Sequence, residues 1–199
     1  MHRHLVRFHN SNNFTPNKTV RLLIQLRKDT ETLDCVVKNL RVAELAIEFD
    51  LYVPDDASKE STITSLSEKY DSLLNERDLE DDGASIQPSH YESKQETIRT
   101  CMSLFNEQRY WECHETLEQI WRRQERGDER DVQQGIILAA SALVHFQKNE
   151  DKVCLGMIPR ALAKLDSWIE GKYYSFDVGK LKQCLREMDK TKVIVIPTI

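Results

Sequence analysis

Two histidines, a glutamate and a serine in the second half of the chain have the residue types and the spacing of a polar site. His114 and Glu118 are four residues apart, so a helix that turns 100° per residue places both on one stripe. The same stripe also contains Tyr110, Leu117 and Trp121. An amphipathic helix buries its apolar stripe, and the sequence therefore predicts that His114 and Glu118 point toward the core.

A second helix, from about residue 130 to residue 147, supplies the other half of this site. It contains no charged residue between Val132 and Phe146, which is typical of a helix that is buried on all sides. Gln134, Ser141 and His145 share one of its faces. If residues 125–129 form a short antiparallel turn, Trp121 lies opposite Gln134, and His114 lies near Ser141 and about one turn from His145.

The predicted pocket allows three roles. His114, Glu118 and His145 could form a purely structural hydrogen-bond network, because buried polar groups almost always find partners. The same three side chains could instead be ligands of a divalent metal ion. They are also the candidates for metal-free acid–base catalysis or small-ligand binding, with a pocket lined by Tyr110, Trp121, Gln134 and Ser141. At helical spacing, however, Tyr110 and Trp121 are also typical core residues.

Composition limits the class of protein. The 199 residues are 40% hydrophobic and 31% charged, as in globular proteins, and they have a net charge of −5 without a block of Lys and Arg. This charge does not favour a nucleic-acid partner, and no stretch is apolar enough for a membrane span or a secretory signal. The five cysteines never form a C-x-x-C pair. We therefore predict reduced cysteines and a cytoplasmic protein.

The first 80 residues have the periodicity of a small mixed sheet. From Ala43 to Val53, apolar residues alternate with polar ones, which predicts a strand with one solvated face. On that basis Phe49→Ala should be costly, and Glu48→Ala should cost little. A partner strand is predicted at residues 33–37 with a turn at Asn39, and further strands at residues 4–8 and 74–79. Helices are predicted after Thr15-Pro16 and from Ser58.

The predicted order β-α-β-β-α-β is that of the ferredoxin-like fold, which hosts many functions. We therefore expect an α+β chain in which a ferredoxin-like domain at residues 1–80 is followed by an acidic and polar linker at residues 81–89. An all-α helical bundle then occupies residues 90–190, and residues 191–199 form an apolar tail. A homodimer through the first domain is one expected use of such a module.

The helical half also carries a recognisable set of residues. They are Phe105-Asn106, the run from Tyr110 to Glu115 with Glu118 and Trp121, then Gln134-Gly135-Ile136, His145, Ala161-Leu162 and Leu165. This pattern resembles the prokaryotic domain-of-unknown-function family numbered three hundred and nine, over about residues 92–172. The resemblance implies an all-α fold for this half and implies no activity. The sequence thus predicts a helical bundle with a polar or metal site, or alternatively a non-catalytic binding module.

Overall fold

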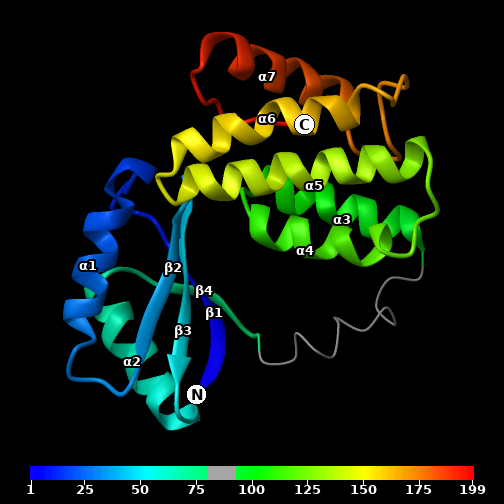
Figure 1. Cartoon of the computed structure of the whole chain (residues 1–199). Helices are drawn as coiled ribbons and strands as arrows, with labels where there is room; N and C mark the ends of the chain where they lie inside the picture. The colour runs from blue at the N-terminus through cyan, green and yellow to red at the C-terminus, as the bar shows by residue number, and fades with distance from the viewer. Residues whose placement is uncertain (80–92) are drawn as a thin grey trace. The chain divides into compact units, whose positions relative to one another are not determined.

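The computed structural model describes residues 1–79 and 93–199, and it shows an α+β chain (Figure 1). The chain divides into two compact units. The sheet unit comprises Met1–Ile86 with Gln147–Asn149, and the helical unit comprises Gln87–Phe146 with Glu150–Ile199. The predicted linker, residues 81–89, lies outside the described residues. In the described ranges, no helix combines the length and the apolar character needed to cross a membrane.

Over its described residues, the sheet unit contains four antiparallel strands and two α-helices. Its elements are β1 (His2–His9), a 3₁₀ turn η1 (Pro16–Lys18), α1 (Thr19–Asp29), β2 (Val36–Val42), β3 (Ala46–Val53), α2 (Asp56–Lys69) and β4 (Leu73–Asp78). The strands are arranged in the order β2-β3-β1-β4, with Val6 paired to Phe49 across the two central strands. Phe8 and Phe49 stack with ring centroids 5.9 Å apart. They belong to a core that also contains Leu22 and Leu26 of α1 and Leu66 of α2.

The strand β3 confirms the predicted apolar face and contradicts the predicted solvated one. Ile47, Phe49, Leu51 and Val53 are buried as expected. Leu45 is 62% exposed, because the strand begins at Ala46, whereas Asp50 is 0% exposed. The reason is that β3 is a central strand, and arginines from both neighbouring strands cover its polar side, as the ion pairs of Asp50 show.

The prediction for β2 is also wrong in position. The strand runs over Val36–Val42, and Asn39 lies inside it rather than at a turn. Asn39 has φ of 52°, and the pairing register of β2 shifts between Lys38 and Arg41. An asparagine in the left-handed region is compatible with a β-bulge as well as with a turn, so the residue type alone could not decide between them.

The helices of the sheet unit begin differently from the sequence prediction. The Thr15 hydroxyl bonds Asn17 instead of capping a helix, and a 3₁₀ turn precedes α1. The carboxylate of Asp55, rather than Ser58, caps α2 by accepting a hydrogen bond from the Ser58 amide at 2.8 Å. Both shifts affect only the first turn, where alternative capping residues compete.

The helical unit contains α3 (Lys94–Asn106), α4 (Tyr110–Trp121), α5 (Asp128–Gln147), α6 (Asp151–Leu165) and α7 (Val178–Thr191). Among residues 93–199, the buried apolar side chains of these five helices form one core cluster. Ser93 caps α3, and residues 90–92, the first residues of the predicted helical bundle, lie outside the described residues. Asp177 caps α7 by accepting from the Lys180 amide. Tyr173 and Phe176 form an isolated bridge before α7 and are both buried.

The apolar tail is part of the helical unit. Ile194 and Ile199 pack against the core cluster. The Ile199 amide donates to Oδ1 of Asn106 at 2.9 Å, and Nδ2 of Asn106 donates to the Ile199 carbonyl at 2.7 Å. Asn106, the last residue of α3, therefore fixes the tail by two reciprocal hydrogen bonds.

Close packing between α5 and α6 leads to a testable difference between two helical glycines. A Cβ on Gly135 would lie 2.6 Å from Cγ and Cδ2 of Leu165, whereas a Cβ on Gly156 would meet no described atom within 4 Å. We expect Gly135→Ala to destabilise the chain by about 1 to 3 kcal/mol through overpacking. In contrast, Gly156→Ala should stabilise it by up to about 1 kcal/mol through helix propensity. Urea unfolding of both variants measures the two signs, and an equal effect would show that Leu165 moves aside freely.

Candidate functional site

Four half-buried side chains form a continuous strip along α4. They are Trp111, His114, Glu118 and Trp121, which we call the α4 strip. Their spacing of three, four and three residues keeps them on one flank of the helix. The core-facing side of α4 is occupied instead by Tyr110, Cys113 and Leu117, which are all fully buried. The strip therefore lies at the edge of the core and is accessible in part.

The imidazole of His114 is positioned by stacking on a tryptophan ring and not by hydrogen bonds. Its imidazole stacks on Trp111 with ring centroids 5.7 Å apart and an interplanar angle of 29°. Nε2 lies 3.9 Å from Oε1 of Glu118, which is too long for a hydrogen bond. Nδ1 is buried and has no hydrogen-bond partner within the described residues. The imidazole thus has a fixed plane and an unused ring nitrogen.

The surroundings of His114 favour its neutral form. Burial lowers the pKa of His114 below the ordinary value, and Arg122 lowers it further, while Glu118 opposes both effects. The net shift is downward. At neutral pH the ring is therefore uncharged, so one ring nitrogen is a donor and the other an acceptor.

Glu118 does not point into the core, contrary to the sequence prediction. Its side chain is 29% exposed, and Oε2 accepts a hydrogen bond from Nη2 of Arg122 at 2.8 Å. The side chain of His114 is 21% exposed. Conversely, Glu112, which is not part of the predicted core-facing stripe, is buried and accepts two 2.7 Å bonds from Arg109. The predicted core-facing stripe of α4 was therefore rotated by a small angle from the observed one. As a result, Glu118 at one edge is partly exposed and Glu112 at the other edge is buried.

An arginine of α5, Arg130, packs against the carboxyl end of α4. The guanidinium of Arg130 lies 4.2 Å from the ring centroid of Trp121. Its Nη1 also donates to the carbonyls of Trp121 and Gln124, both at 2.6 Å. Trp121 thus packs under Arg130, one turn before the predicted partner Gln134. The indole Nε1 of Trp121 is buried and unpaired within residues 1–79 and 93–199.

The other residues of the predicted pocket lie elsewhere. Tyr110 is a core residue whose ring meets Phe105 edge to face at 5.1 Å, so it does not line a surface site. Gln134 and Ser141 are half-buried on α5, and neither forms a side-chain hydrogen bond to another described residue.

The three proposed metal ligands do not come together. Nδ1 of His145 bonds the carboxylate of Glu150, which lies in the turn between α5 and α6. In the part of the chain that the structure describes, no group of three or more His, Cys, Asp or Glu side chains could hold a metal ion. The sequence predicted that His145 would lie about one helical turn from His114. In the structure, His145 instead pairs with Glu150, which is close to it in sequence.

A polar network that the sequence did not predict connects α3, α5 and the segment before α7. Nε2 of Gln133 donates to the Tyr173 hydroxyl at 2.7 Å, and that hydroxyl donates to Glu129 at 3.0 Å. Lys94 donates to the same Glu129 carboxylate at 2.9 Å. The only sequence signal was the adjacent pair Gln133-Gln134, from which the more buried member could not be chosen without the packing of α7.

Comparison with known proteins agrees with the resemblance noted in the sequence. Residues 98–157 match the model of a family described as Domain of unknown function (DUF309). This match spans most of α3, all of α4 and α5 and the first half of α6, and so contains the α4 strip. No curated protein matches the chain.

Two tryptophans differ in a way that tests the geometry of the strip. The indole of Trp168 donates to the Lys172 carbonyl at 3.1 Å, whereas the indole of Trp121 has no described acceptor. An unpaired buried N–H donor destabilises the folded state by about 1 to 3 kcal/mol, and Trp121→Phe removes such a donor. Trp168→Phe instead removes a hydrogen bond that is formed. We therefore expect Trp121→Phe to be the less destabilising change by at least about 1 kcal/mol in urea unfolding. Equal losses would mean that the Trp121 donor is already satisfied.

Proposed function

We propose that the helical unit is a non-catalytic binding module that recognises an extended, acidic polypeptide segment along the α4 strip. The single observation that carries this proposal is the pair of buried, unpartnered ring nitrogens, Nδ1 of His114 and Nε1 of Trp121, on one flank of one helix. Native proteins leave few buried polar groups unpaired, and each one costs stability. A cost of this kind is typical of groups retained for binding.

The shape of the strip supports an extended chain as the ligand. Trp111 and Trp121 are ten residues apart, so the strip is about 15 Å long at 1.5 Å per helical residue. An extended polypeptide advances about 3.3 to 3.6 Å per residue, and four to five residues would therefore cover the strip. Tryptophan is enriched in such contact surfaces because it offers both a large apolar face and a donor. A carbonyl or carboxylate oxygen of the ligand would accept from Nε1 once the indole rotates outward.

The charge at the end of the strip supports an acidic segment. Arg123, which follows α4, is exposed, and no described acidic side chain pairs with it. Arg122 is exposed as well, although it already binds Glu118. These two cations directly follow Trp121 in the sequence, at the end of the strip, and the indole donor of Trp121 would also prefer an oxygen ligand.

The geometry does not favour catalysis at this strip. A general base requires hydrogen-bond reach to its partner, and the 3.9 Å gap between His114 and Glu118 exceeds it. Cys113 is no nucleophile for His114, since it faces the core on the other side of the helix. A contact with the Cys101 thiol and burial both raise the pKa of the Cys113 thiol. His114 and Glu118 are therefore assigned to ligand contact.

Calorimetric titration with a short acidic peptide, acetyl-Gly-Glu-Leu-Glu-Gly-amide, tests the proposal. The wild-type chain should bind this peptide more tightly than the matched basic peptide in which Lys replaces Glu. Trp121→Phe should weaken binding several-fold, while Trp168→Phe should leave it unchanged. A peptide that fails to bind, or that both variants bind equally, would refute the assignment. Cleavage of the peptide, detected by mass spectrometry, would indicate an enzyme instead.

For the sheet unit we infer a ferredoxin-like topology. The element order β1-α1-β2-β3-α2-β4 and the antiparallel strand order β2-β3-β1-β4 support this inference. The predicted homodimer through this unit remains a prediction that sedimentation equilibrium can test. Cytoplasmic location likewise remains a proposal, and it is supported by the five cysteines, which are all free thiols.

A further inference from the structure

We propose that a groove beside α1 in the sheet unit binds a small aryl anion, that is, a flat ring that carries a carboxylate or a phosphate. The groove has a volume of about 360 Å³ and is lined by Phe14, Lys18, Arg21, Leu22, Gln25 and Tyr70. This volume lies at the small end of the range for ligand sites, which is about 300 to 1,000 Å³. It therefore suits a single ring with one acidic group. The site is independent of the α4 strip.

The positive charge of the groove is not neutralised by the protein. Lys18 and Arg21 are both exposed, and neither forms an ion pair with a described residue. They lie at the start of α1, whose first turn contains no acidic residue. The amino end of a helix carries a partial positive charge, which adds to the attraction for an anion. In a chain with a net charge of −5, this local excess of positive charge selects negatively charged ligands.

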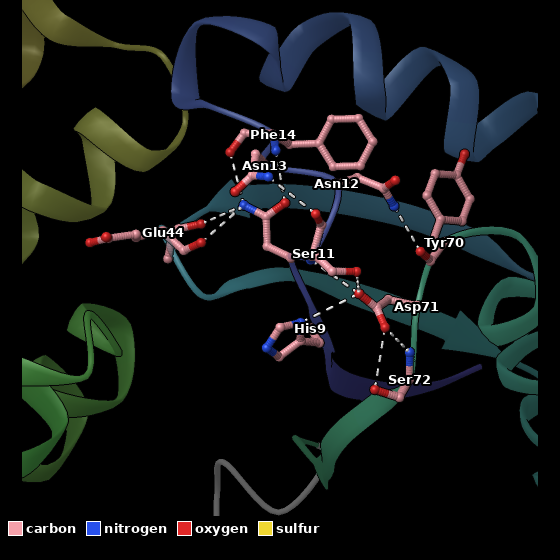
Figure 2. A network of polar contacts seen from close by, with 11 residues as sticks. His9, Ser11, Asn12, Asn13, Phe14, Glu44, Tyr70, Asp71 and Ser72 are labelled. Atoms are coloured by element: carbon pink, nitrogen blue, oxygen red, sulfur yellow. Dashed lines mark hydrogen bonds and ion pairs between the residues drawn. The ribbon is translucent and has the colours of Figure 1, made fainter.

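The first aromatic wall of the groove is held rigidly. Asn10 is buried, and its carboxamide clamps Phe14 from both sides: Oδ1 accepts from the Phe14 amide at 2.8 Å, and Nδ2 donates to the Phe14 carbonyl at 2.8 Å. The same Nδ2 donates to the Ala43 carbonyl at 2.8 Å, which anchors the loop to the end of β2. Figure 2 shows Phe14 at the end of this network, with its ring turned away from the polar contacts.

The second aromatic wall is held from the other side. The Tyr70 hydroxyl donates to Asp29 at 2.6 Å. The Tyr70 carbonyl accepts from Nδ2 of Asn12 at 2.9 Å (Figure 2). Burial and the bond to Asp29 raise the pKa of Tyr70, so the phenol stays neutral. Asp29 also accepts from Gln25 at 3.1 Å and pairs with Lys69, so its charge is already engaged.

Asp71, next to Tyr70 in the sequence, ties the loop that carries Phe14, residues 10–14, to the segment that carries Tyr70. Its carboxylate accepts hydrogen bonds from the amide and the hydroxyl of Ser11 and from the Ser72 amide, and it pairs with His9 (Figure 2). The Ser11 hydroxyl makes the largest contribution to a lowered pKa of Asp71, which keeps the carboxylate charged. The loop from residue 10 to residue 14 is thus preorganised before any ligand binds, which lowers the entropic cost of binding.

The combination of groups sets the ligand chemistry. Leu22 is buried and provides an apolar floor, and the rings of Phe14 and Tyr70 favour a flat apolar body. Lys18 and Arg21 at the rim favour an oxyanion attached to that body. A free inorganic anion would contact only the cationic side chains at the rim, and a neutral ring would contact only the aromatic walls. The site should therefore discriminate against both.

Calorimetric titration of the full chain with phenyl phosphate, benzoate, inorganic phosphate and phenol tests this proposal. Phenyl phosphate or benzoate should bind at least tenfold more tightly than inorganic phosphate and phenol, and the tighter of the two identifies the preferred oxyanion. The double variant Lys18→Gln, Arg21→Gln should lose at least tenfold in affinity for that ligand. Phe14→Leu should weaken aryl binding and leave the weak affinity for inorganic phosphate unchanged.

Lys28→Gln is the matched control, because Lys28 is an exposed lysine of the same helix outside the groove. It should bind like the wild type. Equal losses in Lys28→Gln and in the double variant, or equal affinity for phenyl phosphate and inorganic phosphate, would overturn the proposal by indicating non-specific ion binding. Near-ultraviolet dichroism should show that each variant keeps the native fold, and a double variant that binds normally while folded would also overturn it.

Discussion

Replacing Asp50 with alanine is expected to lower the unfolding free energy by about 3 to 5 kcal/mol, because the buried guanidinium of Arg41 loses one of its carboxylate partners. Asp50 is completely buried, and its Oδ1 accepts from Nη2 of Arg41 at 3.0 Å. Its Oδ2 accepts from Arg3 at 2.9 Å and from Asn39 at 2.7 Å. Arg41 is itself buried, so the substitution would remove one of the two carboxylates that pair with its guanidinium, Asp50 and Glu48.

Urea unfolding of Asp50→Ala measures this loss, and Asp34→Ala is the control. Asp34 is exposed and forms no side-chain hydrogen bond or ion pair with another described residue, so its replacement should change stability by no more than about 0.5 kcal/mol. The double variant Asp50→Leu, Arg41→Met should cost less than the sum of the two single changes, since it removes both buried charges. Strict additivity would show that the two side chains are not energetically coupled.

The same cluster predicts an acid-dependent loss of stability. Burial by itself would raise the pKa of Asp50, but Arg41, Asn39 and Arg3 outweigh it, and the net pKa lies below the ordinary value. A carboxyl with a lowered folded-state pKa adds stability that is present above the unfolded-state pKa of about 3.9 and is lost as pH falls through the folded-state value. Asp50→Ala should therefore flatten the pH dependence of stability below about pH 4, where this carboxyl titrates.

The second large effect is expected for Phe49→Ala, which should cost about 3 to 5 kcal/mol. Phe49 is completely buried at the centre of the sheet and stacks on Phe8, so truncation leaves a cavity. Leu45→Ala is the control, because Leu45 is exposed at the preceding turn and should contribute no more than about 0.5 kcal/mol. Thermal or urea unfolding gives both values, and similar losses for the two variants would contradict the register of β3.

The prediction that Glu48→Ala would cost little stability must be corrected, because the polar face of β3 is covered by arginines and not by solvent. Glu48 is buried, and its Oε1 accepts from Nε of Arg41 at 2.5 Å. Its removal should cost about 1 to 3 kcal/mol, because the bond to a charged and buried donor is lost. The alternation of β3 identified which residues face the apolar core. It could not show that Arg3 of β1 and Arg41 of β2 cover the other face, because the alternation within one strand does not reveal which side chains of the neighbouring strands pair with it.

Sequence reasoning located the site helix but not the orientation of its flanks. The period of 3.6 residues correctly placed Tyr110 and Leu117 in the core, because burial of apolar area dominates the rotation of a helix. His114 and Glu118 lie close to the edge of that stripe, where a small rotation decides between burial and partial exposure. The partner of His145 was missed because Glu150 belongs to the turn between α5 and α6, whose geometry no periodic pattern predicts.

The most direct test of the α4 strip is the indole ¹⁵N–¹H resonance of Trp121 during titration with N-methylacetamide and, separately, with acetate. Trp121→Phe assigns the resonance, and Trp168, whose indole already donates to the Lys172 carbonyl, is the internal control. We expect a saturable shift of the Trp121 resonance, larger for acetate because of the neighbouring arginines, while the Trp168 resonance stays in place. Equal shifts of both resonances, or no shift of Trp121, would contradict a binding role for the strip.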